Sequence, residues 1–99
     1  SLSETFGVAA IEAQAMEIPV IASDIGGVSE VVLNGKTGIL VEPKNVQGLS
    51  QAILNLIENP ALRKSMGKTG RKYVLENYNI EENVLLFENI YHKIIDGLE

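Results

Sequence analysis

Two glutamates near the start of this chain stand on either side of a Phe-Gly pair. The glutamates are Glu4 and Glu12, and the pair is Phe6-Gly7. A carboxylate only accepts hydrogen bonds, and it can take two of them from neighbouring hydroxyls. This chemistry suits a sugar or a ribose and does not suit a phosphate. We therefore expect two hydroxyl-binding groups, one for each end of an elongated ligand.

The segment that positions these carboxylates has the pattern of a helix. Ser3 or Thr5 can act as its N-cap. The run that follows is rich in alanine and places apolar residues at helical spacing, at Val8, Ile11 and Ala15. We predict a helix that starts close to Phe6. Glu4 then lies just before the helix and Glu12 about two turns inside it, roughly 12 Å further along the axis.

The start of that helix also offers backbone amides. The first amides of a helix have no partner within it and carry the positive end of the helix dipole. We expect the amides of Phe6, Gly7 and Val8 to face an anion, which Gly7 allows to approach closely. Taken alone, two glutamates are more often exposed helix side chains, because Glu is mostly found at the surface. The motifs that follow favour ligand binding.

Four further motifs follow in order: Pro19-Val-Ile-Ala-Ser, Gly26-Gly27-x-x-Glu30, Gly35-x-Thr37-Gly38 and Leu40-Val-x-Pro43. Together with Glu4-x7-Glu12, the series resembles the C-terminal, donor-binding half of family-4 retaining glycosyltransferases of GT-B fold. The resemblance covers nearly all of the 99 residues. It implies an α/β fold, a fragment of a Rossmann-like doubly wound parallel-sheet domain with several C-terminal helices.

The resemblance also implies a role for each residue at the start of the chain. Glu4 would contact hydroxyls of the donor sugar at the catalytic centre, without acting as the sole base, and Glu12 would bind the ribose of the nucleotide. The amides around Phe6, Gly7 and Val8 would approach the sugar and the diphosphate. The implied donor substrate is a nucleotide diphosphate sugar, and neither a cofactor nor a metal is implied.

One residue departs from the family pattern. The family usually has glycine just before the Ile-Pro or Val-Pro step, whereas this chain has Glu17 in Glu17-Ile18-Pro19. A side chain other than glycine is disfavoured in the left-handed conformation that often ends a helix. We therefore expect the departure to concern the geometry at the end of the first helix.

The remaining elements alternate as in an α/β domain. Short apolar runs predict buried parallel strands at 19–23 and 38–41, with a turn and a short helix, 28–33, between them. Amphipathic helices are predicted at 46–57, at 60–77 and from residue 80 onward. In the second of these we expect two glycines, Gly67 and Gly70, to weaken the helix and four side chains to face inward, Leu62, Met66, Tyr73 and Val74.

Two strands are too few for so many helices, because an open α/β sheet normally has several strands covered on both faces. We expect residues 1–99 to be one unit, the C-terminal portion of a nucleotide-sugar-binding domain, with the N-terminal domain missing. The predicted last helix carries an apolar stripe through Val84, Phe87 and Tyr91. If partner elements have been removed, we expect that stripe to drive self-association.

Composition limits the other classes of function. The chain has no cysteine and a single histidine, His92, which excludes disulfides, thiol catalysis and a cluster of Cys or His ligands for a metal. The net charge of −5 argues against general nucleic-acid binding. Residues 1–35 hold five acidic residues and no Lys or Arg. Any strong clamp for a diphosphate therefore has to come from outside this chain.

Five of the eight basic residues fall in the predicted helix 60–77, at Arg63, Lys64, Lys68, Arg71 and Lys72. We favour a solvated helix face over a site for phosphate or an anionic membrane, because the cluster winds around the helix. The chain has neither a run of 18 apolar residues nor a signal-like start. We expect a cytoplasmic protein, with peripheral association at the inner membrane face left open.

Two classes of function fit these observations. The first is a retaining glycosyltransferase that moves a sugar to an acceptor hydroxyl, with this chain as its donor-site portion and inactive by itself. The second is a non-catalytic α/β module that binds a nucleotide sugar or a protein partner. Glycoside hydrolysis by paired carboxylates ranks below both, because the surrounding motifs point elsewhere.

Overall fold

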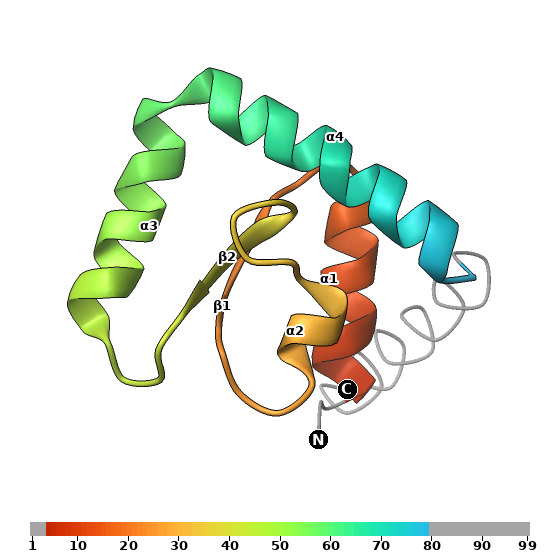
Figure 1. Cartoon of the computed structure of the whole chain (residues 1–99), viewed down its shortest axis with the longest axis horizontal. Coiled ribbons are helices and arrows are strands. Elements are labelled where there is room, and N and C mark those ends of the chain that lie inside the picture. The colour runs from red at the N-terminus through yellow and green to blue at the C-terminus, as the bar shows by residue number, and fades with distance from the viewer. Residues whose placement is uncertain (1–3, 80–99) are drawn as a thin grey trace, which may run out of the picture.

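The computed structural model describes residues 4–79, which form four helices and two strands (Figure 1). In chain order the elements are α1 (Glu4–Ala15), β1 (Val20–Ser23), α2 (Val28–Val31), β2 (Gly38–Val41), α3 (Val46–Glu58) and α4 (Pro60–Asn77). The predicted α/β order is therefore confirmed. The predicted helix from residue 80 onward, with its apolar stripe, lies outside the described residues.

The two strands pair in parallel, with Val20 opposite Gly38 and Ser23 opposite Val41. In Figure 1, α1 and α3 flank the strands on opposite sides, and α4 runs across the end at which the strands begin. We predicted fully buried strands, but every residue of β1 is only half-buried. The reason is that a two-stranded sheet with few covering elements leaves part of each strand accessible.

The hydrophobic core lies between α1, α2 and α4. Its buried members are Ala10, Ile11, Ala15, Val28, Val31, Val32 and Val74. The side chain of Gln14 is also fully buried there, and its Nε2 donates to the carbonyls of Ala10, at 3.1 Å, and Val31, at 3.0 Å. Through these bonds Gln14 ties α1 to α2, while its Oε1 atom is buried without a hydrogen-bond partner among the described residues.

The Gly35-x-Thr37-Gly38 motif has a structural explanation. Gly35 adopts a positive φ of 79°, which suits glycine. The buried hydroxyl of Thr37 accepts a hydrogen bond from the amide of Leu33, at 2.9 Å. A Cβ at Gly38 would lie 2.1 Å from the carbonyl oxygen of Val20, so only glycine lets β2 approach β1 at this point. This motif therefore fixes the turn before β2 and the position at which β2 joins the sheet.

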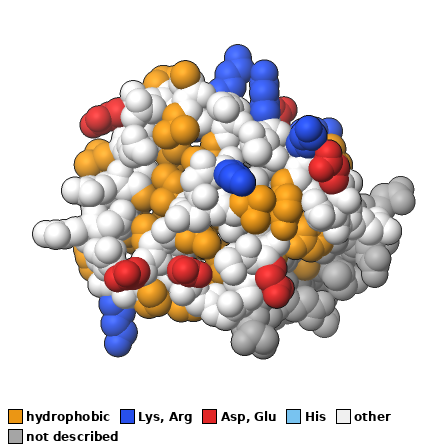
Figure 2. Space-filling view, in the orientation of Figure 1, with side chains coloured by type: hydrophobic (Ala, Val, Ile, Leu, Met, Phe, Trp, Pro, Cys, Tyr) orange, Lys and Arg blue, Asp and Glu red, His pale blue; other side chains and the backbone are white. Residues whose placement is uncertain are grey.

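The long helices have the predicted bounds but differ in their faces. Met66 and Val74 are buried in α4 as predicted, and Tyr73 is half-buried, whereas Leu62 is exposed. In α3 only Ala52 and Leu56 are buried, and the larger apolar side chains face outward, at Val46, Leu49, Ile53 and Ile57. Figure 2 shows hydrophobic side chains over α3 and a gathering of Lys and Arg over α4.

Candidate donor-binding site

Helix α1 begins earlier than the sequence pattern predicted. Its first residue is Glu4, so Glu4 lies within the helix and not before it. Thr5 is also helical, which rules it out as the N-cap, and Ser3 lies outside the described residues. Gly7 and Val8 follow the first turn, and amides beyond the first turn of an α-helix are paired with carbonyls four residues earlier. Any anion-facing amides therefore belong to the very start of the helix.

Phe6 and Gly7 have structural roles at this helix start. The side chain of Phe6 is half-buried and packs against the core cluster. Gly7 is buried, so the backbone of α1 is closely approached at that residue. These two residues hold the first turn against the fold, which fixes the position of the backbone that follows Glu4.

Glu12 has an unusual environment for a helix carboxylate. Its side chain is half-buried, and its Oε2 atom is buried without a hydrogen-bond partner among the described residues. A buried carboxylate oxygen left unpaired is costly, so such an atom is expected to have a partner in the functional state. The eight residues from Glu4 to Glu12 span roughly 12 Å of helix.

The start of α1 lies at the same end of the sheet as the carboxyl ends of the strands (Figure 1). There β1 is followed by the turn 24–27, whose Asp24 amide donates to the carbonyl of Val41 at 2.8 Å. Gly26 in this turn has a positive φ of 54°. In open α/β sheets, ligands bind outside the carboxyl ends of the strands. The fold therefore brings Glu4, the first turn of α1 and the Gly26-Gly27 turn to the edge where a ligand is expected.

The other end of α1 is closed by the chain itself. The amide of Glu17 donates to the carbonyl of Gln14 at 3.0 Å, and the amide of Ile18 donates to the carbonyl of Ala13 at 2.9 Å. This pair of bonds is the Schellman motif, with Glu17 at the left-handed position and a φ of 63°. The family's glycine conformation is thus kept at Glu17 despite the side chain.

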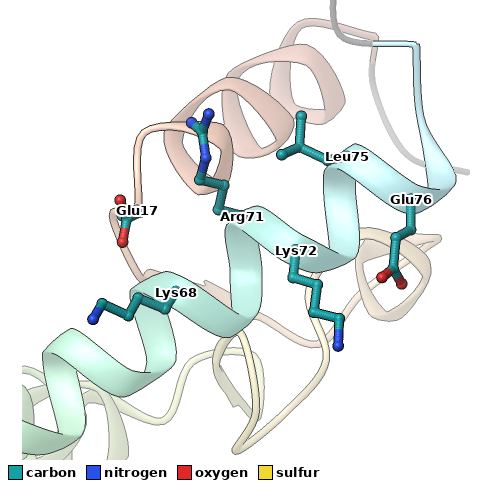
Figure 3. Close-up of a pocket in the computed structure, with 6 residues that line it drawn as sticks. All are labelled: Glu17, Lys68, Arg71, Lys72, Leu75 and Glu76. Carbon is teal, nitrogen blue, oxygen red and sulfur yellow. The ribbon is translucent and has the colours of Figure 1, made fainter.

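Helix α4 packs on this closed end. A Cβ at Gly67 would lie 2.2 Å from the carbonyl oxygen of Glu17, so the two backbones meet there. Arg71 Nη1 donates to the carbonyl of Ala15 at the end of α1, and Figure 3 shows its side chain directed toward that end. Helix α4 is continuous, and both of its glycines are buried, Gly67 against Glu17 and Gly70 against Gln14; that they weaken the helix stays a prediction.

The basic residues of α4 have two different roles. The two arginines bind helix carbonyls. Like Arg71, Arg63 donates through Nη1, to the carbonyl of Leu56 at 2.6 Å and to that of Ile57 at 3.2 Å. Lys68 and Lys72 are exposed and line an open hollow of about 430 Å³ together with Glu17, Arg71, Leu75 and Glu76. They extend from α4 in different directions (Figure 3). The prediction of a solvated helix face holds for Lys68 and Lys72. It did not include the hydrogen bonds of the two arginines to helix carbonyls.

Residues 4–79 contain no group of three His, Cys, Asp or Glu side chains placed to hold a metal ion. Within the same residues, no helix is both long enough and apolar enough to cross a membrane.

The family model of glycosyl transferases group 1 matches residues 1–73. The chain belongs to this family. An uncharacterised glycosyltransferase of Methanocaldococcus jannaschii is 38% identical over 96 residues, which is 97% of this chain and 27% of that protein. A capsular polysaccharide biosynthesis glycosyltransferase of Staphylococcus aureus is 35% identical over 96 residues, 97% of this chain and 25% of that protein.

Among solved structures, the sucrose-phosphate synthase of Thermosynechococcus elongatus matches with a TM-score of 0.70 and 36% identity. The match covers 90% of this chain and 22% of that structure. The predicted membership in the GT-B glycosyltransferases of family 4, with an α/β fold and parallel strands, is confirmed. The chain spans about a quarter of the length of the relatives it matches.

Proposed function

We propose that the protein to which this chain belongs transfers a sugar, with retention, from a nucleotide diphosphate sugar to an acceptor hydroxyl. In this proposal residues 1–99 are the C-terminal portion of its donor-binding domain, and the acceptor-binding domain lies elsewhere. The observation that carries the proposal is the buried Oε2 of Glu12, which has no hydrogen-bond partner among residues 4–79, on the helix that Glu4 begins, in a chain of the glycosyl transferases group 1 family.

Each proposed site residue has one task. Glu4 accepts hydrogen bonds from hydroxyls of the donor sugar, and Glu12 accepts them from the ribose, because hydroxyls are the donors that a carboxylate pairs with best. The backbone of Phe6, Gly7 and Val8, near the start of the helix, lies close to the diphosphate. A spacing of roughly 12 Å along the helix matches an elongated ligand with hydroxyls at both ends.

The proposed chemistry follows from where charge develops. As the bond between sugar and diphosphate breaks, negative charge grows on the leaving group, and aligned helix amides and the helix dipole stabilise it. Residues 1–35 contain no Lys or Arg, so stronger neutralisation of the diphosphate comes from residues outside this chain. For that reason the isolated chain binds donor weakly and does not transfer sugar.

The donor sugar and the acceptor are not part of the proposal. The relatives are named for different functions, one for capsular polysaccharide biosynthesis and one as a sucrose-phosphate synthase. Polysaccharide biosynthesis is one candidate process. A cytoplasmic location is proposed on the donor class alone.

Saturation-transfer NMR of the 99-residue chain with UDP-glucose, UDP-N-acetylglucosamine and GDP-mannose tests the donor site. We expect ribose-proton signals with at least one donor and their loss in Glu12→Ala. The matched control is Glu58→Ala, which removes an exposed carboxylate at the end of α3 and keeps the signals. Ribose signals that persist in Glu12→Ala, or a folded chain that gives none with any donor, would refute the proposed site.

A further inference from the structure

Helix α2 is too short to hold itself in place. It has four residues, and a helix of one turn is not stable without tertiary contacts. Its last carbonyls also lack partners within the helix and have to find them elsewhere. The carbonyl of Val28 is bonded by the amide of Val32 at 2.9 Å, and that of Val31 by Nε2 of Gln14 at 3.0 Å. Helix α1 thus supplies one of the external partners.

The carbonyl of Glu30 receives two tyrosine hydroxyls. Tyr73, in α4, donates at 2.6 Å, and Tyr78, just after α4, donates at 2.9 Å. Their rings pack edge to face, with centroids 6.2 Å apart and an interplanar angle of 71°. Two phenols from a segment more than 40 residues away therefore converge on one backbone oxygen.

The same backbone unit leads directly to the glycine turn. The amide of Glu30 donates to the carbonyl of Gly27 at 3.0 Å. The amide of Val28, the residue after Gly27, donates to the carbonyl of Ile25 at 3.2 Å. Holding Glu30 therefore holds the Gly26-Gly27 turn. In Figure 1 this turn lies at the carboxyl edge of the sheet, the same end at which α1 starts.

We propose that Tyr73 and Tyr78 are positioning residues for the donor site: they fix α2, and through the Glu30 backbone they fix the Gly26-Gly27 turn against the start of α1. This inference rests on the proposed function. Neither tyrosine needs to touch the donor, because each acts through the carbonyl of Glu30. Burial, together with the neighbouring Tyr73, raises the pKa of Tyr78, so its hydroxyl remains a hydrogen-bond donor at neutral pH.

The shared acceptor makes a quantitative expectation possible. Removing one hydroxyl leaves the carbonyl with its other partner, so Tyr73→Phe and Tyr78→Phe should each weaken donor affinity less than about twofold. Removing both leaves the carbonyl without either hydroxyl, and the double variant should lose about fivefold or more. The loss in the double variant then exceeds the product of the two single losses.

The test uses the 99-residue chain, titrated with UDP-glucose, UDP-N-acetylglucosamine and GDP-mannose and followed in amide NMR spectra. Without donor, the double variant should shift the Gly26 and Gly27 signals and speed hydrogen exchange in α2. The matched control is Arg63→Met, which removes hydrogen bonds to the carbonyls of Leu56 and Ile57 at the end of α3. This control should lower thermal stability and leave donor affinity unchanged.

The two proposals fail in different ways. A folded wild-type chain that binds none of the donors overturns the proposed function. A wild-type chain that binds, with a double variant that binds equally well, overturns only the positioning role, even if the Gly26 and Gly27 signals move. An equal loss of affinity in Arg63→Met would also overturn it, because the effect would then follow general stability.

Discussion

The polar groups of α1 are satisfied to different degrees along the helix. At the carboxyl end, the chain closes the helix with two Schellman hydrogen bonds, the backbone contact at Gly67 and the Arg71 hydrogen bond to Ala15. Glu4 begins the helix, and Glu12, three residues before its last residue, keeps a buried oxygen without a partner in the described structure. The carbonyls at the carboxyl end are bonded within the chain, whereas Oε2 of Glu12, like the buried Oε1 of Gln14, has no hydrogen-bond partner among the described residues.

This difference separates stability from binding within one helix. Groups that are satisfied by the chain itself contribute to folding, and their loss should lower the free energy of unfolding. Groups left unsatisfied in the fold reduce stability and persist where a ligand uses them. Changes at the closed end should therefore lower stability and leave donor affinity intact. Changes at Glu12 should lower donor affinity without lowering stability.

The largest expected effect at the closed end is that of Gly67→Ala. The added Cβ would lie 2.2 Å from the carbonyl oxygen of Glu17, and a backbone atom cannot swing aside. Overpacking of this kind costs about 1–3 kcal/mol, against a gain in helix propensity of about 1 kcal/mol. We expect a net loss of up to about 2 kcal/mol and a melting temperature lower by up to about 10 °C, measured by circular dichroism.

Gly70→Ala is the matched control, because it lies one turn further along the same helix. Its Cβ would lie 3.4 Å from the Gln14 side chain, which is close to an ordinary contact. We expect it to be neutral or slightly stabilising. If both alanine variants melted alike, the tight contact at Gly67 would not be a determinant of stability.

Local patterns predicted most of the fold. The apolar runs of the two strands and the helical spacing in 46–57 and 60–77 each act over a few residues, and all four elements occur at the predicted places. Several of the features that the sequence did not predict are contacts between residues distant in sequence. Nothing near Gly67 indicates that it will meet Glu17, and neither Tyr73 nor Tyr78 carries a local signal that points to Glu30. Such pairings depend on how the helices cross.

The candidate site was likewise predictable from the sequence only in part. The spacing of Glu4 and Glu12 was available from the sequence, and so was the glycine that lets the backbone be approached. The sequence did not show that α1 begins at Glu4, because Ser and Thr at both 3 and 5 are acceptable N-caps. It also could not show that one oxygen of Glu12 is buried, since burial comes from packing.

Arg71→Met should have the next largest effect. Arg71 donates to the last helical carbonyl of α1, where a cation also interacts favourably with the helix dipole. Methionine keeps much of the apolar stem and removes the charge and the donors. Because the side chain is exposed, we expect a loss of only about 1 kcal/mol in urea denaturation. Lys72→Met, one residue away and exposed, should change stability by less than about 0.5 kcal/mol.

Glu17→Gly should have the smallest effect, and in the opposite direction. Glu17 has a φ of 63°, a conformation that disfavours a side chain by about 1–2 kcal/mol. Glycine removes that strain but makes the unfolded chain more flexible, which costs about 0.4–1 kcal/mol. The net expectation is a stabilisation of about 0.5–1 kcal/mol in urea denaturation, with donor affinity unchanged. Met16→Gly, which adds the same flexibility at a residue without positive φ, should destabilise the chain. If Glu17→Gly were destabilising as well, its side chain would contribute more than its strained backbone costs, and the closed end would depend on Glu17 itself.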